Sequence, residues 1–343
     1  MSSFGVFWLL EVGLNMRVNL QRLCMVRVLV HAGVIAVLVT ACGEQGSNSQ
    51  ALSDSLVERS GPACPTSEAP AFIAIAGGRF IMGSERGYPE EAPEREVSVG
   101  AFALTTHEIT NADFSRFVEA TGYVTVAERA PDPALHTDIP REALVAGSAV
   151  FVPPTGAEYW WQFVPGASWQ APEGPGSDIS DRADHPVVHV AYDDVLAYAN
   201  WVGGRLPTEA EWEFAARGGL EQAIYAWGDT PPHEGTPRAN TWQGLFPVIN
   251  DADDGYIGSA PVGEFDANGY GLHDMTGNVW EWVAAPDRQS NMGLIKGGSF
   301  LCSDNFCRRF RPSANQPQEL DFSTNHIGFR VAFDADCGAE PEA

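Results

Sequence analysis

Residues 297–311 read Gly-Gly-Ser-Phe-Leu-Cys-Ser-Asp-Asn-Phe-Cys-Arg-Arg-Phe-Arg and place Cys302 and Cys307 five positions apart. Two cysteines at this spacing can form a disulfide, hold a soft metal ion, or act as a nucleophile and its partner. The arginines that follow favour thiolates, and thiolates select Cu(I), zinc or iron–sulfur clusters. Zinc in a structural site takes a full tetrahedral ligand set, and no second cysteine pair is present in the sequence to complete one. Spacing alone therefore leaves a structural disulfide and a soft-metal site as alternatives.

The segment resembles the active-site signature of the formylglycine-generating enzymes, also called sulfatase-modifying factors. That signature is Gly-Gly-Ser, an aromatic residue, any residue and a cysteine, with a second cysteine five positions later. Further stretches agree with the family in order and spacing: 204–214 (GRLPTEAEWEF), 240–248 (NTWQGLFPV), 268–282 (NGYGLHDMTGNVWEW) and 325–330 (NHIGFR). The resemblance covers roughly residues 71–335 and implies one irregular, loop-rich α+β domain of the sulfatase-modifying-factor (C-type-lectin-like) fold.

The composition agrees with a domain of this kind. Apolar residues make up 44% and charged residues 19% of the 343 residues, so a sizeable core is available, while 35 glycines and 24 prolines interrupt regular elements. We therefore expect little regular secondary structure. The expected segments are two short strands around the Gly-Gly turn of 71–84, a strand over 97–104, mostly loop over 129–180, and short strands and long loops over 218–333.

Three amphipathic helices are predicted from apolar spacing and from N-cap residues. They are expected to begin after Thr110, at Tyr192 and after Thr208. Glu211 lies three residues beyond Thr208 and completes a capping box with it.

The N-terminus has the pattern of an export signal. A basic stretch with three arginines precedes an apolar run over 28–39, which is too short for a comfortable transmembrane helix, and small residues then lead to Cys42. This order resembles a bacterial lipoprotein signal; the alternative is an uncleaved membrane anchor. The chain would then lie on the periplasmic side of a bacterial membrane as a lipoprotein. Its expected parts are a signal peptide over 1–41, lipidation at Cys42, a polar tether over 42–70, the catalytic domain over 71–335 and a tail over 336–343.

The remaining cysteines, Cys64 and Cys337, lie on either side of the domain. In an oxidising compartment a disulfide between them is one interpretation, and two unpaired cysteines in flexible ends are the other. The net charge of −25 becomes −27 without residues 1–41, which contain three arginines and one glutamate. A chain this acidic is repelled by nucleic acid and by anionic lipid, so we expect no nucleic-acid partner and membrane contact only through the lipid anchor.

The resemblance also implies an activity. It is that of a copper-dependent oxidase, which uses dioxygen to convert the cysteine of a Cys-x-Pro/Ala-x-Arg motif in an unfolded sulfatase to formylglycine. The resemblance implies Cu(I) held between the thiolates of Cys302 and Cys307, with the substrate cysteine as a further thiolate. Ser299 matches the family serine close to the oxygen and substrate pocket, and Trp280 matches an aromatic residue lining that pocket. Core packing is the alternative role for each.

Two positions depart from the family pattern. Phe306 stands where these enzymes commonly have tyrosine, which removes a hydroxyl near the oxygen site. Asn315 stands where they have arginine, in a segment that the resemblance places along the substrate groove. Both belong to the predicted substrate and oxygen pocket, so peptide specificity is the property most affected.

Two calcium sites are implied by the same resemblance. The first would use the side chains of Asn240 and Asp254 and the carbonyls of Thr241 and Tyr256. The second would use the side chains of Asp274 and Glu281 and the carbonyls of Gly277 and Val279. Hard oxygen ligands from short acidic loops suit Ca²⁺. Bound ions would fix loops in a fold that has few hydrogen-bonded elements; the alternative is that one of the sites is empty.

Fold does not determine function, so two alternatives stay open. One is a non-catalytic binding module in which Cys302 and Cys307 form a disulfide, and the other is an oxidase of a non-sulfatase maturation pathway. Sulfoxide synthases of the wider superfamily typically need an additional iron-binding histidine domain, and the eight histidines of this chain show no such cluster. His185 and His189 are expected to be structural.

Overall fold

The computed structural model describes residues 61–337, with the exception of residues 135, 136, 155, 157, 158, 233, 286, 287 and 289. The predicted signal peptide, the lipidation site Cys42 and the chain after residue 337 lie outside the described residues. No helix in the described part is both long and apolar enough to span a membrane.

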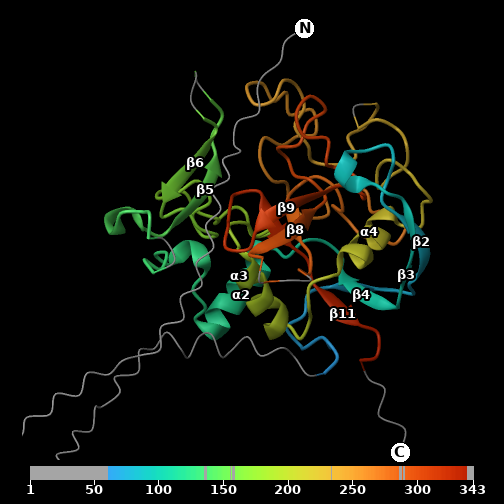
Figure 1. Cartoon of the computed structure of the whole chain (residues 1–343), viewed down its shortest axis with the longest axis horizontal. Helices are drawn as coiled ribbons and strands as arrows, with labels where there is room; N and C mark the ends of the chain where they lie inside the picture. The colour runs from blue at the N-terminus through green and yellow to red at the C-terminus, as the bar shows by residue number, and fades with distance from the viewer. Residues whose placement is uncertain are drawn as a thin grey trace, which may run out of the picture. The chain divides into compact units, whose positions relative to one another are not determined.

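The α+β expectation is confirmed. Within the described residues, the strands form four small sheets with short α-helices beside them (Figure 1). The helices are α2 (Asn111–Thr121), α3 (Tyr192–Trp201) and α4 (Glu209–Arg217), with short 3-10 helices η1 (Pro89–Glu91), η2 (Val126–Glu128) and η3 (Arg141–Ala143). The rest of the described chain is loop and turn.

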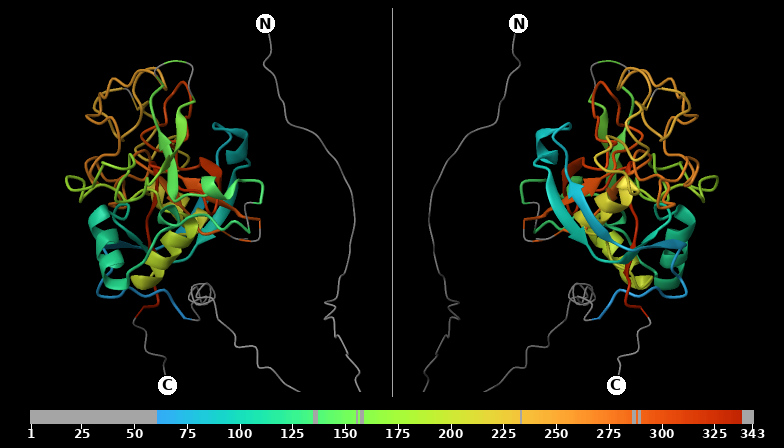
Figure 2. Two further views of the ribbon diagram at one scale, coloured as in Figure 1. Left: turned by 90° about the vertical axis from the view of Figure 1, so that its left-hand side faces the viewer. Right: turned by 90° about the vertical axis from the view of Figure 1, so that its right-hand side faces the viewer.

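One sheet joins the two ends of the domain. β1 (Phe72–Ile75) pairs antiparallel with β4 (Phe102–Thr105), which pairs antiparallel with β11 (Ala332–Asp334). In Figure 2 the blue start and the red end of the described chain accordingly lie together.

The single strand that we predicted over 97–104 is two strands in different sheets. β3 (Arg95–Val99) pairs with β2 (Gly78–Met82), and the chain then turns before β4 begins. A Cβ on Gly77 would lie 2.4 Å from the carbonyl oxygens of both Val99 and Gly100. The backbone at Gly77 therefore passes very close to the backbone at Val99 and Gly100. This crossing lies where β3 ends, two residues before β4 begins.

The second sheet carries the segments that the sequence singled out. Its strand order is β10 (Ile327–Phe329), β7 (Trp280–Trp282), β8 (Met292–Lys296) and β9 (Asn315–Glu319). β10 and β7 are parallel, whereas β7 with β8 and β8 with β9 are antiparallel. Residues 297–314, including both cysteines of the opening motif, therefore form the connection between two neighbouring strands.

The helices begin where the sequence predicts. The hydroxyl of Thr110 accepts a hydrogen bond from the third amide of α2 at 3.1 Å, and that of Thr208 accepts one from Glu211 N at 3.2 Å. In each case the reciprocal half of the capping box is also present. Phe114 of α2 stacks on Tyr198 of α3, with ring centroids 5.8 Å apart, so the apolar faces of these helices form part of the core.

The segment 129–180, predicted to be mostly loop, contains a β-hairpin. β5 (Gly147–Phe151) pairs with β6 (Trp161–Pro165) along five residue pairs. The strands are short, and their partners are distant in sequence: the Phe151 ring lies 5.8 Å from that of Trp242, and Ala149 forms a bridge with Thr324. These contacts with distant residues stabilise the strand conformation. The hairpin therefore could not be predicted from the strand propensity of residues 147–165 alone.

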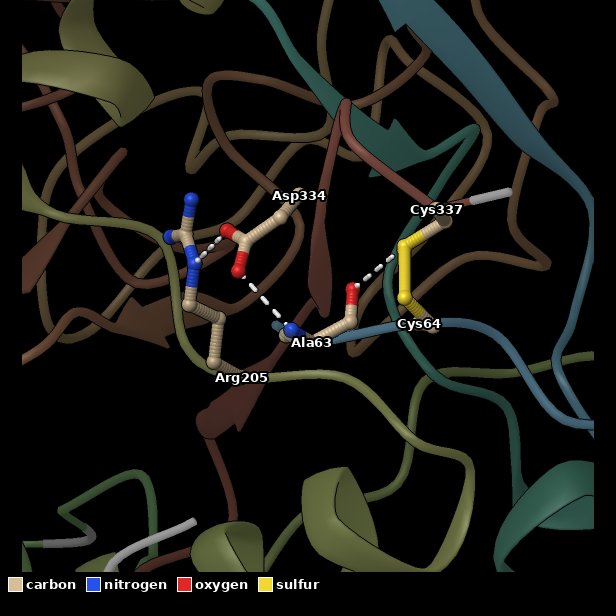
Figure 3. The surroundings of a disulfide bond; sticks show 5 residues. All are labelled: Ala63, Cys64, Arg205, Asp334 and Cys337. Atoms are coloured by element: carbon tan, nitrogen blue, oxygen red, sulfur yellow. Dashed lines mark hydrogen bonds and ion pairs between the residues drawn. A yellow bond between two sulfur atoms is a disulfide. The ribbon is translucent and has the colours of Figure 1, made fainter. Parts of the chain in front are cut away.

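Cys64 and Cys337 form a disulfide with a Cα–Cα distance of 5.2 Å (Figure 3). The amide of Ala63 donates to Asp334 Oδ2 at 2.8 Å, and Asp334 Oδ1 accepts from Arg205 Nε at 2.7 Å. Residues 61–70, which we assigned to the tether, thus pack against the domain, and the folded part begins about ten residues before position 71.

Candidate active site

The motifs of the sequence meet around the connection between β8 and β9. The amide of Trp242 donates to the carbonyl of Cys302 at 2.9 Å, and the amide of Phe300 donates to the carbonyl of Asn278 at 2.9 Å. Gly277 N donates to Gly297 O at 2.9 Å. Backbone hydrogen bonds therefore bring residues 240–248 and 268–282 directly against the cysteine-bearing loop.

Cys302 and Cys307 lie together in the interior, with 1% and 8% of their surface exposed. Both are free cysteines, and their sulfur atoms are 2.7 Å apart, beyond the disulfide bond length of about 2.0 Å. Turns on both sides hold the loop: Cys302 N donates to Ser299 O at 2.8 Å and Cys307 N to Ser303 O at 3.1 Å. The fold thus presents two unoxidised sulfur atoms in one buried position.

The two sulfur atoms differ in proton affinity. A hydrogen bond from Cys302, together with the amide and guanidinium of Arg309, lowers the pKa of Cys307 to about 7 against the opposing effect of burial. Burial raises the pKa of Cys302 well above its usual range. Above about pH 7 the pair therefore holds one proton, with the negative charge on Cys307, which makes it a soft anionic ligand or nucleophile.

Ser299 and Trp280 lie in the interior beside the cysteine loop. Ser299 is fully buried, and its hydroxyl accepts a hydrogen bond from Leu301 N at 3.3 Å. Trp280 is buried in β7 and belongs to the same apolar cluster as the two cysteines. Both positions agree with a role at the site, and their burial is equally what core packing requires.

Phe306 and Asn315 occupy different surroundings. The Phe306 side chain is 53% exposed, and its ring stacks on Phe246 with centroids 4.4 Å apart and meets the edge of Trp160 at 6.0 Å. The Asn315 side chain points to helix α4, where its amide donates to Glu209 Oε1 at 3.3 Å. The structure thus places Phe306 in an aromatic surface beside Cys307, whereas the described contact of Asn315 is with the scaffold; its part in substrate choice stays a prediction.

The residues of the first predicted calcium site are neighbours. Asp254 accepts hydrogen bonds from Thr241 N at 2.9 Å and from Tyr256 N at 3.0 Å. Asn240 Oδ1 is buried, and within the described residues it has no hydrogen-bond partner. An unsatisfied buried carbonyl oxygen is a ligand that a hard cation can take, and here it belongs to the residue that precedes Thr241.

The second predicted calcium site fits less well. The Glu281 carboxylate already accepts from Arg330 at 2.7 Å and from Trp212 Nε1 at 2.6 Å, so its charge is neutralised within the protein. Asp274 Oδ2 accepts from Gly263 N at 2.7 Å, and burial raises the pKa of Asp274 to about 6. Among the described residues, no group of three or more His, Cys, Asp or Glu side chains is arranged to hold a metal ion.

His185 and His189 make structural contacts. His189 is fully buried between Ser148 Oγ at 2.7 Å and the carbonyl of Pro172 at 2.8 Å, and His185 Nδ1 lies 3.0 Å from Ser259 Oγ. Sequence reasoning missed a different feature, the turn around Tyr88, which lies against the segment after Cys307. Its Pro and Glu residues indicate a turn, and no local signal indicates its partner.

Comparison with known proteins identifies the family. Residues 58–335 match the model of the sulfatase-modifying factor enzyme 1-like domain. A formylglycine-generating enzyme from Mycobacterium tuberculosis is 49% identical over 292 residues, covering 77% of this chain and 97% of that protein. The corresponding enzyme from Thermomonospora curvata is 45% identical, covering 79% and 95%.

Two further similar proteins differ from these enzymes in name. A mouse protein named inactive C-alpha-formylglycine-generating enzyme 2 is 40% identical and covers 78% of this chain and 86% of that protein. PvdO from Pseudomonas aeruginosa shares the fold, with a TM-score of 0.54 at 23% identity over 80% of this chain and all of that chain. On the match over residues 58–335 and these identities, the chain belongs to the sulfatase-modifying-factor family, together with the formylglycine-generating enzymes.

Proposed function

We propose that this chain oxidises the cysteine of a Cys-x-Pro/Ala-x-Arg motif in an unfolded sulfatase to formylglycine. The high identity to formylglycine-generating enzymes supports this activity. Because one relative is named inactive, the family alone does not decide it. The observation that carries the proposal is the pair of free, buried sulfur atoms of Cys302 and Cys307, which lie 2.7 Å apart in the connection between β8 and β9.

We further propose Cu(I) as the cofactor and dioxygen as the oxidant. The donor chemistry fits, because two cysteine sulfurs in an apolar cluster are soft ligands and one of them ionises near neutral pH. Cys302 and Cys307 would hold the ion, and when bound it would supply a coordination position for the substrate sulfur together with redox chemistry toward dioxygen. The two cysteines belong to one apolar cluster with Trp280 and Phe310, and their low exposure keeps water from the sulfur atoms.

The entrance to the pair would be formed by the exposed ring of Phe306, which packs on the buried Phe246 and against the partly buried Trp160. The exposed ring of Phe306 directly precedes Cys307, so a peptide cysteine that reaches the pair passes beside it. The net charge of −25 attracts a substrate segment that contains arginine. The aromatic surface then gives apolar contact to the residues that flank the substrate cysteine.

Calcium is proposed for the site of Asn240, Thr241, Asp254 and Tyr256, where an unpartnered buried oxygen supports it. The site of Asp274, Gly277, Val279 and Glu281 is a weaker candidate, because Arg330 already compensates Glu281. An ion at the first site would fix the 240–256 loop, whose Trp242 amide bonds to Cys302.

Export is also proposed, with the protein held by a lipid on Cys42 at the periplasmic side of a bacterial membrane. The disulfide between Cys64 and Cys337 supports an oxidising compartment. Metabolic labelling with a radioactive fatty acid should mark the wild-type protein and leave Cys42→Ala unlabelled. Label in the Cys42→Ala variant would contradict lipidation at this position.

The activity is tested with purified protein loaded with Cu(I) and a peptide containing Cys-Thr-Pro-Ser-Arg. Mass spectrometry and an aldehyde-reactive hydrazide detect the formylglycine, and an oxygen electrode measures consumption. Conversion that is lost in Cys302→Ala and Cys307→Ala, with the fold retained, would support the proposal. An unmodified peptide together with a Cys302–Cys307 disulfide in the purified protein would favour the non-catalytic binding module.

A further inference from the structure

A tight turn within residues 244–251 carries exposed aliphatic side chains beside the cysteine loop. The amides of Val248 and Ile249 both donate to Leu245 O at 2.9 Å, so these three residues belong to one turn. Each of the three side chains is more than half exposed. A single exposed aliphatic side chain is common, but several gathered in one turn are typical of an interaction site. We call Leu245, Val248 and Ile249 the 245–249 apolar surface.

The turn is anchored to the chain between the two cysteines. Asn305 of this connection donates from Nδ2 to the carbonyl of Phe246 at 3.4 Å, and its Oδ1 accepts from Phe246 N at 3.4 Å. Trp242 donates from Nε1 to Ile249 O at 2.7 Å and from its amide to Cys302 O at 2.9 Å. These hydrogen bonds therefore hold the exposed turn in a fixed position relative to the cysteine loop.

The 245–249 apolar surface adjoins the exposed ring of Phe306, which directly precedes Cys307. Phe246 is the buried residue of the turn, and its ring stacks on that of Phe306 with centroids 4.4 Å apart. Leu245 precedes Phe246 in the chain, so the exposed side chains of the turn begin next to this stacked pair. A polypeptide that brings a cysteine past Phe306 therefore has the 245–249 apolar surface beside it.

Carboxylates lie next to this apolar surface and limit what can occupy it. A Cβ on Gly244 would lie 2.9 Å from Asp251 Oδ2, so this exposed carboxylate is at the start of the turn. Asp253 is also exposed. A second copy of the chain carries a net charge of −25, so charge repulsion opposes self-association through this face. An unfolded polypeptide with apolar residues and an arginine matches both the apolar and the acidic character.

We propose that the 245–249 apolar surface binds an apolar stretch of the unfolded substrate polypeptide, next to the motif whose cysteine is oxidised. The inference rests on the proposed function for the identity of the substrate. The contact removes the exposed aliphatic side chains of the turn from water against apolar side chains that an unfolded chain leaves accessible. It thereby gives a long unfolded segment a higher affinity than the isolated motif.

The test is the binding of fluorescent peptides to the purified full chain with no metal added, measured by fluorescence anisotropy. The core peptide is Ser-Thr-Pro-Ser-Arg, in which serine replaces the reacting cysteine, so that no oxidation can occur. Longer peptides carry Leu-Val-Ile either before or after this core, and their counterparts carry Ser-Gly-Ser at the same place. At least one apolar extension should lower the Kd by about tenfold relative to its polar counterpart.

Variants of the chain locate this gain in affinity. Leu245→Ser combined with Ile249→Ser should remove most of the gain, because it removes apolar surface and leaves every charge in place. Val248→Ser should reduce the gain by about threefold. Val124→Ser is the matched control: it removes the same side chain from an exposed position after α2 and should change the gain by less than about twofold. Thermal unfolding verifies that each variant folds.

The inference is overturned if neither apolar extension raises the affinity, if the gain persists in the double variant, or if Val124→Ser reduces it as much as Val248→Ser. Sedimentation equilibrium adds a further check. A wild-type dimer that the double variant abolishes would also overturn the inference, because a second copy would then occupy the surface.

The outcome separates this inference from the proposed activity, because the serine peptides report binding alone. Binding that depends on the 245–249 apolar surface, without conversion of the corresponding cysteine peptide, supports the inference while the proposed function fails. Conversion of the cysteine peptide, with no gain in affinity from either apolar extension, overturns the inference and leaves the proposed function standing.

Discussion

The substitution Arg330→Met is predicted to lower the free energy of unfolding by about 3–5 kcal/mol, the range for removing one partner of a buried ion pair. Arg330 is fully buried, and its Nε and Nη2 each donate to Glu281 at 2.7 Å. It also donates to the carbonyls of Thr105 and His273, both at 3.1 Å. Methionine fills similar space, so the loss comes from the uncompensated charge of Glu281 and the unsatisfied carbonyls rather than from a cavity.

Two variants make this prediction specific. Arg205→Met is the matched control: Arg205 also bonds two carboxylates, each at 2.7 Å, but its side chain is 32% exposed, so its removal should cost about 1 kcal/mol or less. Adding Glu281→Gln to Arg330→Met should recover at least about 1 kcal/mol, because the amide oxygen still accepts from Trp212 and the charge of Glu281 is removed together with its partner.

The assay is urea unfolding followed by tryptophan fluorescence, with a chelator present so that a bound cation does not compensate Glu281. Equal destabilisation by Arg330→Met and Arg205→Met would refute the reasoning, because burial would then make no difference to the ion pair. Failure of Glu281→Gln to recover stability would show that the stranded charge is not the source of the loss.

The other predictions concern the ends, the cation site and the pH dependence of stability. Replacing both Cys64 and Cys337 by alanine should lower the free energy of unfolding by about 2–5 kcal/mol in urea unfolding, because the disulfide closes a loop of 273 positions; unchanged stability would contradict this. Ca²⁺ should raise the thermal midpoint of the wild type but not that of Asn240→Ala, and an equal rise in both would exclude the Asn240 oxygen as a ligand. Burial lowers the pKa of His189 to about 4. The unfolded chain therefore takes up a proton first, and stability should fall by about 3 kcal/mol as the pH drops from about 6.5 to 4. His189→Asn should remove this part of the pH dependence in denaturant unfolding at pH 7 and pH 4, and a slope unchanged by the substitution would count against it.

The features that the sequence predicted well depend on local chemistry. The N-caps at Thr110 and Thr208 follow from a hydroxyl at the right distance from a helical amide, and the helices begin there. The proximity of Cys302 and Cys307 follows from their short separation along one loop. The family signature located that loop, and the structure shows that neighbouring strands β8 and β9 hold its ends.

The features that the sequence did not predict depend on distant partners. The β5–β6 hairpin is short, and Trp242 and Thr324 stabilise it from elsewhere in the chain. The turn at Tyr88 contacts the segment after Cys307 only because the fold brings these two distant parts of the chain together. No periodicity or motif of residues 83–93 encodes this contact.

Asn315 shows how strand register limits inference from a motif. We expect its segment to line a substrate groove, which stays a prediction; the structure places Asn315 in β9 opposite Lys296 of β8. This register directs its side chain to Glu209 of α4. Register is set by the whole strand pair, so the orientation of one side chain cannot be read from its neighbours in sequence.

The central claim is that Cys302 and Cys307 form a metal-binding, oxidising site rather than a structural disulfide. The most direct measurement is aldehyde formation in a Cys-Thr-Pro-Ser-Arg peptide incubated with the purified, Cu(I)-loaded full chain, quantified by mass spectrometry. We predict conversion by the wild type, and none by Cys302→Ala or Cys307→Ala. A wild type that binds Cu(I) through both cysteines yet leaves this peptide and longer sulfatase segments unmodified would contradict the claim.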